Sequence, residues 1–108
     1  MERKNAWRNY DETELKNLEA LSLRYRRFLD DGKTERECVA LAVALAEKKG
    51  YKSLADVIET GIAPKPGEGV YVNVMGKAVL LFLMGKAPLE KGVNIVGAHV
   101  DSPRLDIK

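Results

Sequence analysis

The sequence contains one cysteine, Cys38, and one histidine, His99, among its 108 residues. A single cysteine cannot close an intrachain disulfide, and it cannot supply the several thiolates of a cysteine-based zinc site. This sparse use of cysteine fits a reducing compartment. The charged opening residues lack the apolar core of a secretory signal peptide. The sequence therefore predicts a cytoplasmic protein.

Long apolar runs and an excess of one charge are also missing. The longest apolar run, Ala78 to Met84, is far shorter than the ~20 residues of a helix that spans a bilayer. Lys and Arg number 18 against 16 Asp and Glu, which gives a net charge of +2. Neither half of the chain holds a basic stripe of the kind that binds nucleic acids. We expect neither a membrane nor a nucleic acid among the partners.

The residues that are present predict a folded α/β chain, because 45% are hydrophobic and their spacing changes midway. Helices are expected at about residues 11–60, where apolar residues recur every three or four positions between capping signals. The expected caps are Asp11 with Glu14, Thr34 with Glu37, and Ser53. The apolar positions expected to pack are Leu15, Leu18, Leu21, Tyr25, Phe28 and Leu29, then Cys38, Leu41, Ala42 and Leu45, then Leu54, Val57 and Ile58.

Strands are expected at about residues 69–108, after a connector rich in proline and glycine. Val70–Met75 alternates between apolar and polar positions, whereas Ala78–Met84 is apolar on both faces and is predicted to be a central strand. The short Gly76-Lys77 turn predicts an antiparallel hairpin. A third strand is expected at Val93–Val100. Alternation starts again at residues 104–108, which predicts that the 108 residues are the first part of a longer domain.

His99 and Asp101 are the residues best placed for chemistry. Side chains at positions i and i+2 of an extended segment point to the same side, so the imidazole and the carboxylate can approach each other. A carboxylate that accepts a proton from a histidine ring is the usual support of a zinc-bound imidazole. One histidine and one carboxylate do not complete a zinc site. His99 is therefore either a hydrogen-bonded structural residue or one ligand of a site whose other ligands lie elsewhere.

The end of the sequence, Val96-Gly97-Ala98-His99-Val100-Asp101-Ser102-Pro103-Arg104-Leu105-Asp106-Ile107-Lys108, resembles the first metal-binding segment of the M18 metalloaminopeptidases, the family of aspartyl aminopeptidase. The resemblance is strongest to the bacterial branch of that family. It extends back to Glu2–Trp7, to Lys33–Arg36, and to the hairpin around Asn73 and Gly76-Lys77.

This resemblance implies roles for two residues. His99 matches the histidine that binds one of two zinc ions, and Asp101 matches the catalytic aspartate that holds the histidine ring in place. The remaining carboxylates, the general base and a second histidine of such a site would follow Lys108, as would the family's dimerisation domain. Arg104 is a candidate for binding a substrate carboxylate, although its alternating pattern favours an exposed surface residue.

We therefore expect an α/β fold in which N-terminal helices precede the strands of a mixed sheet, as part of the α/β/α sandwich of a zinc-peptidase catalytic domain. Residues 1–108 would be the N-terminal portion of that domain. The implied full-length protein is a zinc-dependent aminopeptidase that acts on peptide substrates and forms a homo-oligomer. The 108 residues alone would be inactive. The alternative is a small α/β binding or interaction module in which His99 and Asp101 are structural.

Overall fold

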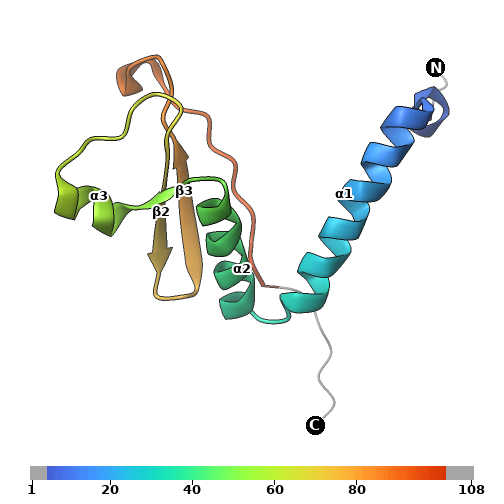
Figure 1. Ribbon diagram of the computed structural model, residues 1–108, viewed down its shortest axis with the longest axis horizontal. Helices are drawn as coiled ribbons and strands as arrows, with labels where there is room; N and C mark the ends of the chain where they lie inside the picture. Colours follow the sequence, from blue (N-terminus) through green and yellow to red (C-terminus); the bar gives the residue numbers. More distant parts are fainter. Residues whose placement is uncertain (1–4, 102–108) are drawn as a thin grey trace, which may run out of the picture. The chain divides into compact units, whose positions relative to one another are not determined.

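The computed structural model describes residues 5–101. The chain divides into two compact units, Met1–Asp30 and Asp31–Lys108. Figure 1 traces the chain in colours that follow the sequence. Among the described residues, no helix is both long enough and apolar enough to cross a membrane.

The first unit consists of a short 3-10 helix, Ala6–Asn9, and most of helix α1, Glu12–Asp31. The expected capping box at the start of α1 is confirmed. The backbone N–H of Glu14 donates to Asp11 Oδ1 at 2.8 Å, and the backbone N–H of Asp11 donates to Glu14 Oε2 at 2.9 Å. These bonds satisfy two amide groups that the first turn leaves without helical partners. The expected packing of α1 is not found, because none of its side chains is buried.

Helix α2, Glu35–Lys48, opens the second unit with the second expected capping box. The backbone N–H of Thr34 donates to Glu37 Oε2 at 2.8 Å, and the Thr34 hydroxyl accepts from the backbone N–H of Glu37. The helix buries Cys38, as expected, together with Val39 and Ala46. The prediction that Leu45 packs inward is wrong, since 55% of it is exposed. Periodicity defines an apolar stripe, but the sheet determines which edge of that stripe is covered.

Three strands form a mixed sheet in the order β1-β2-β3. β1, Lys52–Ser53, pairs in parallel with β2, Gly69–Val74, and β2 pairs antiparallel with β3, Ala78–Leu83. The predicted hairpin and the mixed α/β class are confirmed, whereas β1 was not expected. α2 contacts β2 and β3, and α3, Leu54–Thr60, contacts β1 and β2. In Figure 1, α2 and α3 lie on either side of the hairpin.

The position of β3 differs from the prediction. Within the part of the chain that the structure describes, β3 lies at an edge of the sheet and pairs only with β2. Leu80, Leu81 and Phe82 are each about half exposed, and 66% of Leu83 is exposed. A strand that is apolar on both faces needs cover on both, and the described residues do not provide it. The strand therefore leaves apolar surface exposed.

The hairpin turn is attached to α2 through its backbone. Met75 and Gly76 both have positive φ angles, 56° and 69°, and the backbone N–H of Lys77 donates to the carbonyl of Val74 at 3.0 Å. Two left-handed central residues give the turn the twist that matches the flanking strands. Arg36 Nη1 donates to the carbonyl oxygen of Met75 at 3.1 Å. The start of α2 is thereby tied to the tip of the hairpin.

The two ends of α3 and the connector match the sequence prediction, but the packing of α3 does not. The Ser53 hydroxyl accepts from the backbone N–H of Ala55 at 3.1 Å, and Gly61 ends α3 with a left-handed φ of 66°. The expectation that Ile58 packs inward is wrong, because 71% of it is exposed. The connector after Gly61 is a loop, as predicted. Its end joins the sheet, since the N–H of Gly67 donates to the carbonyl of Met84 at 2.8 Å.

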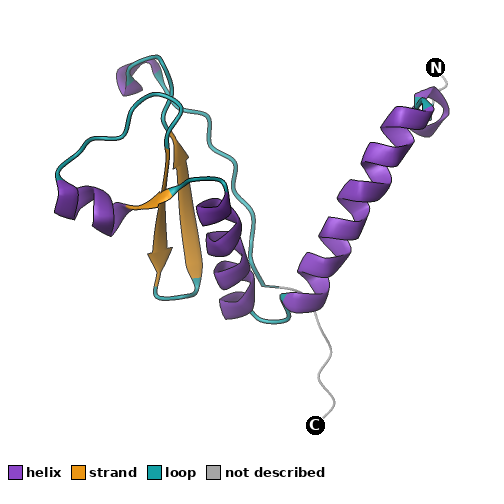
Figure 2. Ribbon diagram, viewed as in Figure 1, coloured by secondary structure: helices purple, strands orange, loops and turns teal. Residues whose placement is uncertain are grey.

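The predicted third strand is not formed. After β3 the chain runs through a 3-10 helix, Leu89–Lys91, and residues 92–101 have no regular structure, as the loop colour in Figure 2 shows. Ile95 is 86% exposed and Val96 is 97% exposed. A strand exists only through hydrogen bonds to a neighbour, and no described residue supplies one here. The alternation expected at residues 104–108 lies outside the described residues.

Gly69 is predicted to be intolerant of a side chain. A Cβ added there would lie 2.5 Å from the Tyr51 ring, against its Cγ and both Cδ atoms, so the whole ring would have to move. Gly69→Ala should lower the free energy of unfolding by about 1–3 kcal/mol. The matched control is Gly85→Ala, whose nearest atoms lie at 4.0 Å. Urea unfolding followed by circular dichroism checks the difference, and equal midpoints for the two variants would contradict it.

Candidate metal centre

His99 and Asp101 lie in the irregular segment that follows the 3-10 helix, and their side chains meet as the sequence predicted. His99 Nδ1 lies 3.1 Å from Asp101 Oδ1 and 2.9 Å from the backbone carbonyl oxygen of Asp101. The contact is local, because only one residue separates the two partners. The pair therefore forms here without the strand in which it was expected.

These two contacts determine which ring nitrogen of His99 carries the proton. Both partners of Nδ1 are oxygen acceptors, so Nδ1 carries the proton in the neutral ring. The lone pair is then on Nε2, the nitrogen that points away from Asp101. A neutral imidazole whose other nitrogen donates to a carboxylate is the form in which histidine binds zinc. The donor chemistry of His99 therefore fits a zinc ion.

The pair lies at the surface and does not form a complete site. The side chain of His99 is 74% exposed and that of Asp101 is 68% exposed. The described residues contain no cluster of three or more His, Cys, Asp or Glu side chains that could hold a metal ion. A zinc site uses three or four protein ligands. The described part of the chain thus offers one candidate ligand, His99, and a carboxylate in contact with its ring. Arg104 lies outside the described residues.

A second polar arrangement was missed by the sequence analysis. Tyr71 on β2 donates its hydroxyl to Glu47 Oε1 on α2 at 2.6 Å. Both residues lie at ordinary positions of regular elements, and nothing in their spacing marks them as partners. Only the docking of α2 against the sheet brings them together.

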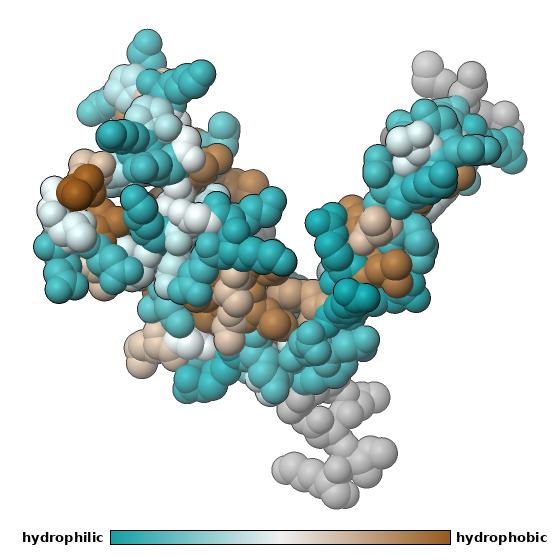
Figure 3. Space-filling model, in the orientation of Figure 1, coloured by the Kyte–Doolittle hydropathy of each residue, from teal (hydrophilic) through white to brown (hydrophobic). Residues whose placement is uncertain are grey.

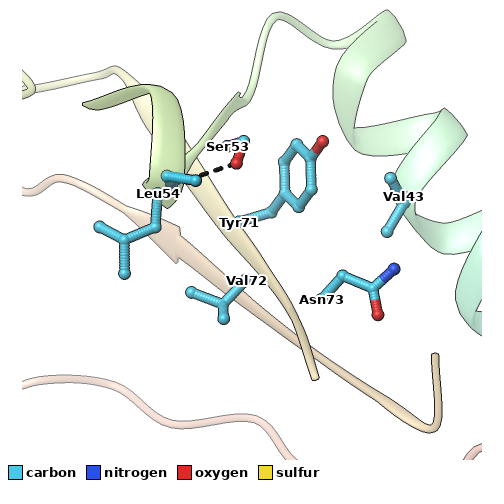
Figure 4. A pocket seen from close by; sticks show the side chains of 7 residues that line it. Val43, Ser53, Leu54, Tyr71, Val72 and Asn73 are labelled. Carbon is cyan, nitrogen blue, oxygen red and sulfur yellow. Dashed lines mark hydrogen bonds between the residues drawn. The ribbon is translucent and has the colours of Figure 1, made fainter. Parts of the chain in front are cut away.

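Tyr71 also lines a cavity of about 250 Å³, with Val43, Ser53, Leu54, Ala55, Val72 and Asn73. Figure 4 shows Tyr71 and Asn73 on the side that faces Val43 of α2, and Leu54 at the start of α3. Ser53, one of the lining residues, is the last residue of β1 that pairs with β2, and the chain turns there into α3. The polar groups in it have structural partners. The Ser53 hydroxyl caps α3, and Asn73 Oδ1 accepts from the backbone N–H of Gly76 at 2.9 Å.

The Tyr71–Glu47 bond gives a pH dependence with a definite sign. The bond to the Glu47 carboxylate, followed by partial burial and the carboxylate's charge, raises the pKa of Tyr71 above its usual value of about 10. Because folding favours the neutral phenol, this contribution to stability is complete below about pH 10 and is lost as the pH rises through the raised pKa. Glu47→Gln should move the pKa of Tyr71 back toward its usual value.

Ultraviolet titration of tyrosinate checks this prediction, with Tyr71→Phe identifying the late-titrating group among the four tyrosines. Glu59→Gln is the control, since Glu59 makes no contribution to the raised pKa. An unchanged tyrosine titration in Glu47→Gln would show that the hydrogen bond does not set the pKa.

The mixed α/β fold and a histidine in contact with a neighbouring carboxylate fit the class of metallopeptidases that the sequence resemblance implies. Comparison with known proteins identifies the family. The chain belongs to the aminopeptidase I zinc metalloprotease (M18) family, whose model matches residues 28–108.

Relatives and a solved structure support this assignment. The chain is 49% identical over 99% of its length to the probable M18 family aminopeptidase 1 of Clostridium acetobutylicum. It is 38% identical over its whole length to the protein of the same name from Thermotoga maritima. The crystal structure of aminopeptidase I from Borrelia burgdorferi B31 matches 94% of the chain with a TM-score of 0.82 and 33% identity. The chain spans about a quarter of the length of these proteins, 22–24% of each.

Proposed function

We propose that these 108 residues are the N-terminal portion of the catalytic domain of a zinc-dependent aminopeptidase, which removes N-terminal residues from peptides. The observation that carries the proposal is the His99–Asp101 pair, in which Nδ1 is held by Asp101 and Nε2 is left for a metal ion. The family match supports it, since the pair lies inside the matched residues 28–108. The full-length enzyme would hold two zinc ions per site, act in the cytoplasm and assemble as a homo-oligomer.

Each residue of the pair has a distinct task in this proposal. His99 would hold one zinc ion through Nε2. Asp101 fixes the ring orientation and the tautomer, and its negative charge makes the imidazole a stronger donor. Bound zinc supplies an activated water and polarises the scissile carbonyl. The general base and the other ligands would come from the remaining three quarters of the enzyme. The competing interpretation is a binding or interaction module in which the contact between His99 and Asp101 is structural and stabilises only the local backbone.

The 108-residue chain should bind zinc weakly and hydrolyse no aminoacyl substrate. One imidazole cannot hold zinc strongly when the other ligands are missing. Isothermal titration with zinc and an assay with aminoacyl substrates, each repeated after treatment with a chelator, check this expectation. Hydrolysis by the purified chain that a chelator abolishes would contradict the need for further ligands.

Variants of the full-length enzyme separate the two roles. His99→Ala should remove one zinc ion per subunit and nearly all activity. Asp101→Asn keeps the size of the side chain but removes its charge, so it should retain more zinc while losing about 10–100-fold in activity or metal affinity. Elemental analysis and steady-state kinetics measure both effects.

The matched control is Glu90→Gln, which neutralises an exposed carboxylate on the nearby 3-10 helix and should change neither zinc content nor rate. If His99→Ala keeps the full zinc content and near-normal turnover, the metal-ligand role of His99 is wrong.

A further inference from the structure

The ring of His99 has two acceptors for one proton. Nδ1 lies 2.9 Å from the backbone carbonyl oxygen of Asp101 and 3.1 Å from Oδ1 of the same residue. Both distances lie within the range of a hydrogen bond. Because a neutral imidazole carries a single proton, the two oxygens compete for the same Nδ1–H group. One contact belongs to the backbone and the other to a side chain, and the two respond differently to solvent and to substitution.

The contact with the carboxylate is the weaker of the two. A strong hydrogen bond from nitrogen to a charged oxygen is short, about 2.7–2.9 Å, and the distance to Oδ1 exceeds that range. The side chain of Asp101 is 68% exposed, and hydrophilic side chains cover most of the face drawn in Figure 3. Water competes for exposed polar contacts and salt screens the charge. Holding the carboxylate in place also costs rotamer freedom.

The contact with the backbone carbonyl does not have these costs. Its length of 2.9 Å is the usual one for N–H···O, about 2.9–3.0 Å. The carbonyl is neutral, so salt does not screen it, and it has no side-chain rotamers to lose. Only Val100 separates the two residues, and this half-buried, β-branched residue favours extended backbone. A backbone carbonyl is also a common partner for the second nitrogen of a metal-binding histidine.

We propose that the backbone carbonyl of Asp101 is the group that positions the ring of His99, and that the Asp101 carboxylate acts on the ring through its charge. The carbonyl holds the proton on Nδ1 and leaves the lone pair on Nε2 before any metal is present. The carboxylate then makes that lone pair a stronger donor. Any residue at position 101 supplies the carbonyl, whereas only an acidic residue supplies the charge. The inference rests on the proposed function for the metal that Nε2 would bind.

The tautomer of His99 can be measured directly, because the chain contains no other histidine. Nitrogen NMR shifts of Nδ1 and Nε2 in the metal-free 108-residue chain show which nitrogen carries the proton, at about pH 9, where the ring is neutral. A free imidazole side chain prefers the proton on Nε2. In Asp101→Ala the proton should stay mainly on Nδ1, with the tautomer ratio changed less than about twofold. The matched control is Glu90→Ala, which removes an exposed carboxylate from the nearby 3-10 helix and should leave the ratio unchanged.

A change of the backbone itself tests the carbonyl. An ester in place of the amide bond between Asp101 and Ser102 weakens the carbonyl of Asp101 as an acceptor and leaves both side chains of the pair intact. This change should lower the ratio of the Nδ1–H to the Nε2–H tautomer by at least about twofold. High salt should leave the ratio of the unmodified chain unchanged, since the acceptor that sets it is neutral.

Transfer of the proton to Nε2 in Asp101→Ala would assign the positioning to the carboxylate and overturn the inference. A tautomer ratio that does not respond to the ester would overturn it as well. Either result leaves the proposed function standing, because the tautomer is measured without metal. The zinc content of His99→Ala in the full-length enzyme tests that function separately.

Discussion

The antiparallel pairing of β2 with β3 is the constraint on which the second unit depends. Its ladder joins six residue pairs, from Gly69 with Leu83 to Val74 with Ala78. β1 then pairs with the outer edge of β2, and α2 packs against both strands of the hairpin. Both ends of the ladder are also secured, by the hydrogen bonds of Gly67 with Met84 and of Arg36 with Met75. The positions of the helices in this unit follow from the hairpin.

Close packing at one glycine makes this arrangement specific. Gly69 begins β2 and leaves room for the ring of Tyr51, which lies three residues after the end of α2. Any side chain at Gly69 would push the ring away and with it the chain that leads into β1. Two residues further along β2, Tyr71 reaches back to Glu47 of α2. The same face of one strand thus holds the end of α2 through a packing contact and a hydrogen bond.

The candidate metal centre has a different physical basis from this core. His99 is oriented by Asp101 alone, through atoms only two residues away, and so the pair needs no sheet to form. Because no sheet covers the pair, the side chains of His99 and Asp101 are both largely exposed to solvent. A ligand that the local chain already orients loses little conformational freedom when further ligands arrive. Such a pair suits a site completed by distant parts of a longer protein.

The sequence by itself determined the features that depend on neighbouring residues. Both capping boxes, the hairpin turn and the approach of His99 to Asp101 could be predicted because each joins atoms within a few positions of one another. The alternation at Val93–Val100 is equally clear in the sequence, yet it forms no strand. Its hydrogen-bonding partner would have to come from another part of a chain, which periodicity cannot identify.

Only the tertiary structure decided which faces and edges are used. β3 is apolar enough for the centre of a sheet but lies at an edge, and α2 buries Val39 and Ala46 where its stripe suggested Leu45. The Tyr71–Glu47 bond joins residues 24 positions apart. In each case several arrangements satisfy the same local preferences. The choice among them depends on the free energy of contacts between distant segments, and a linear pattern does not contain that information.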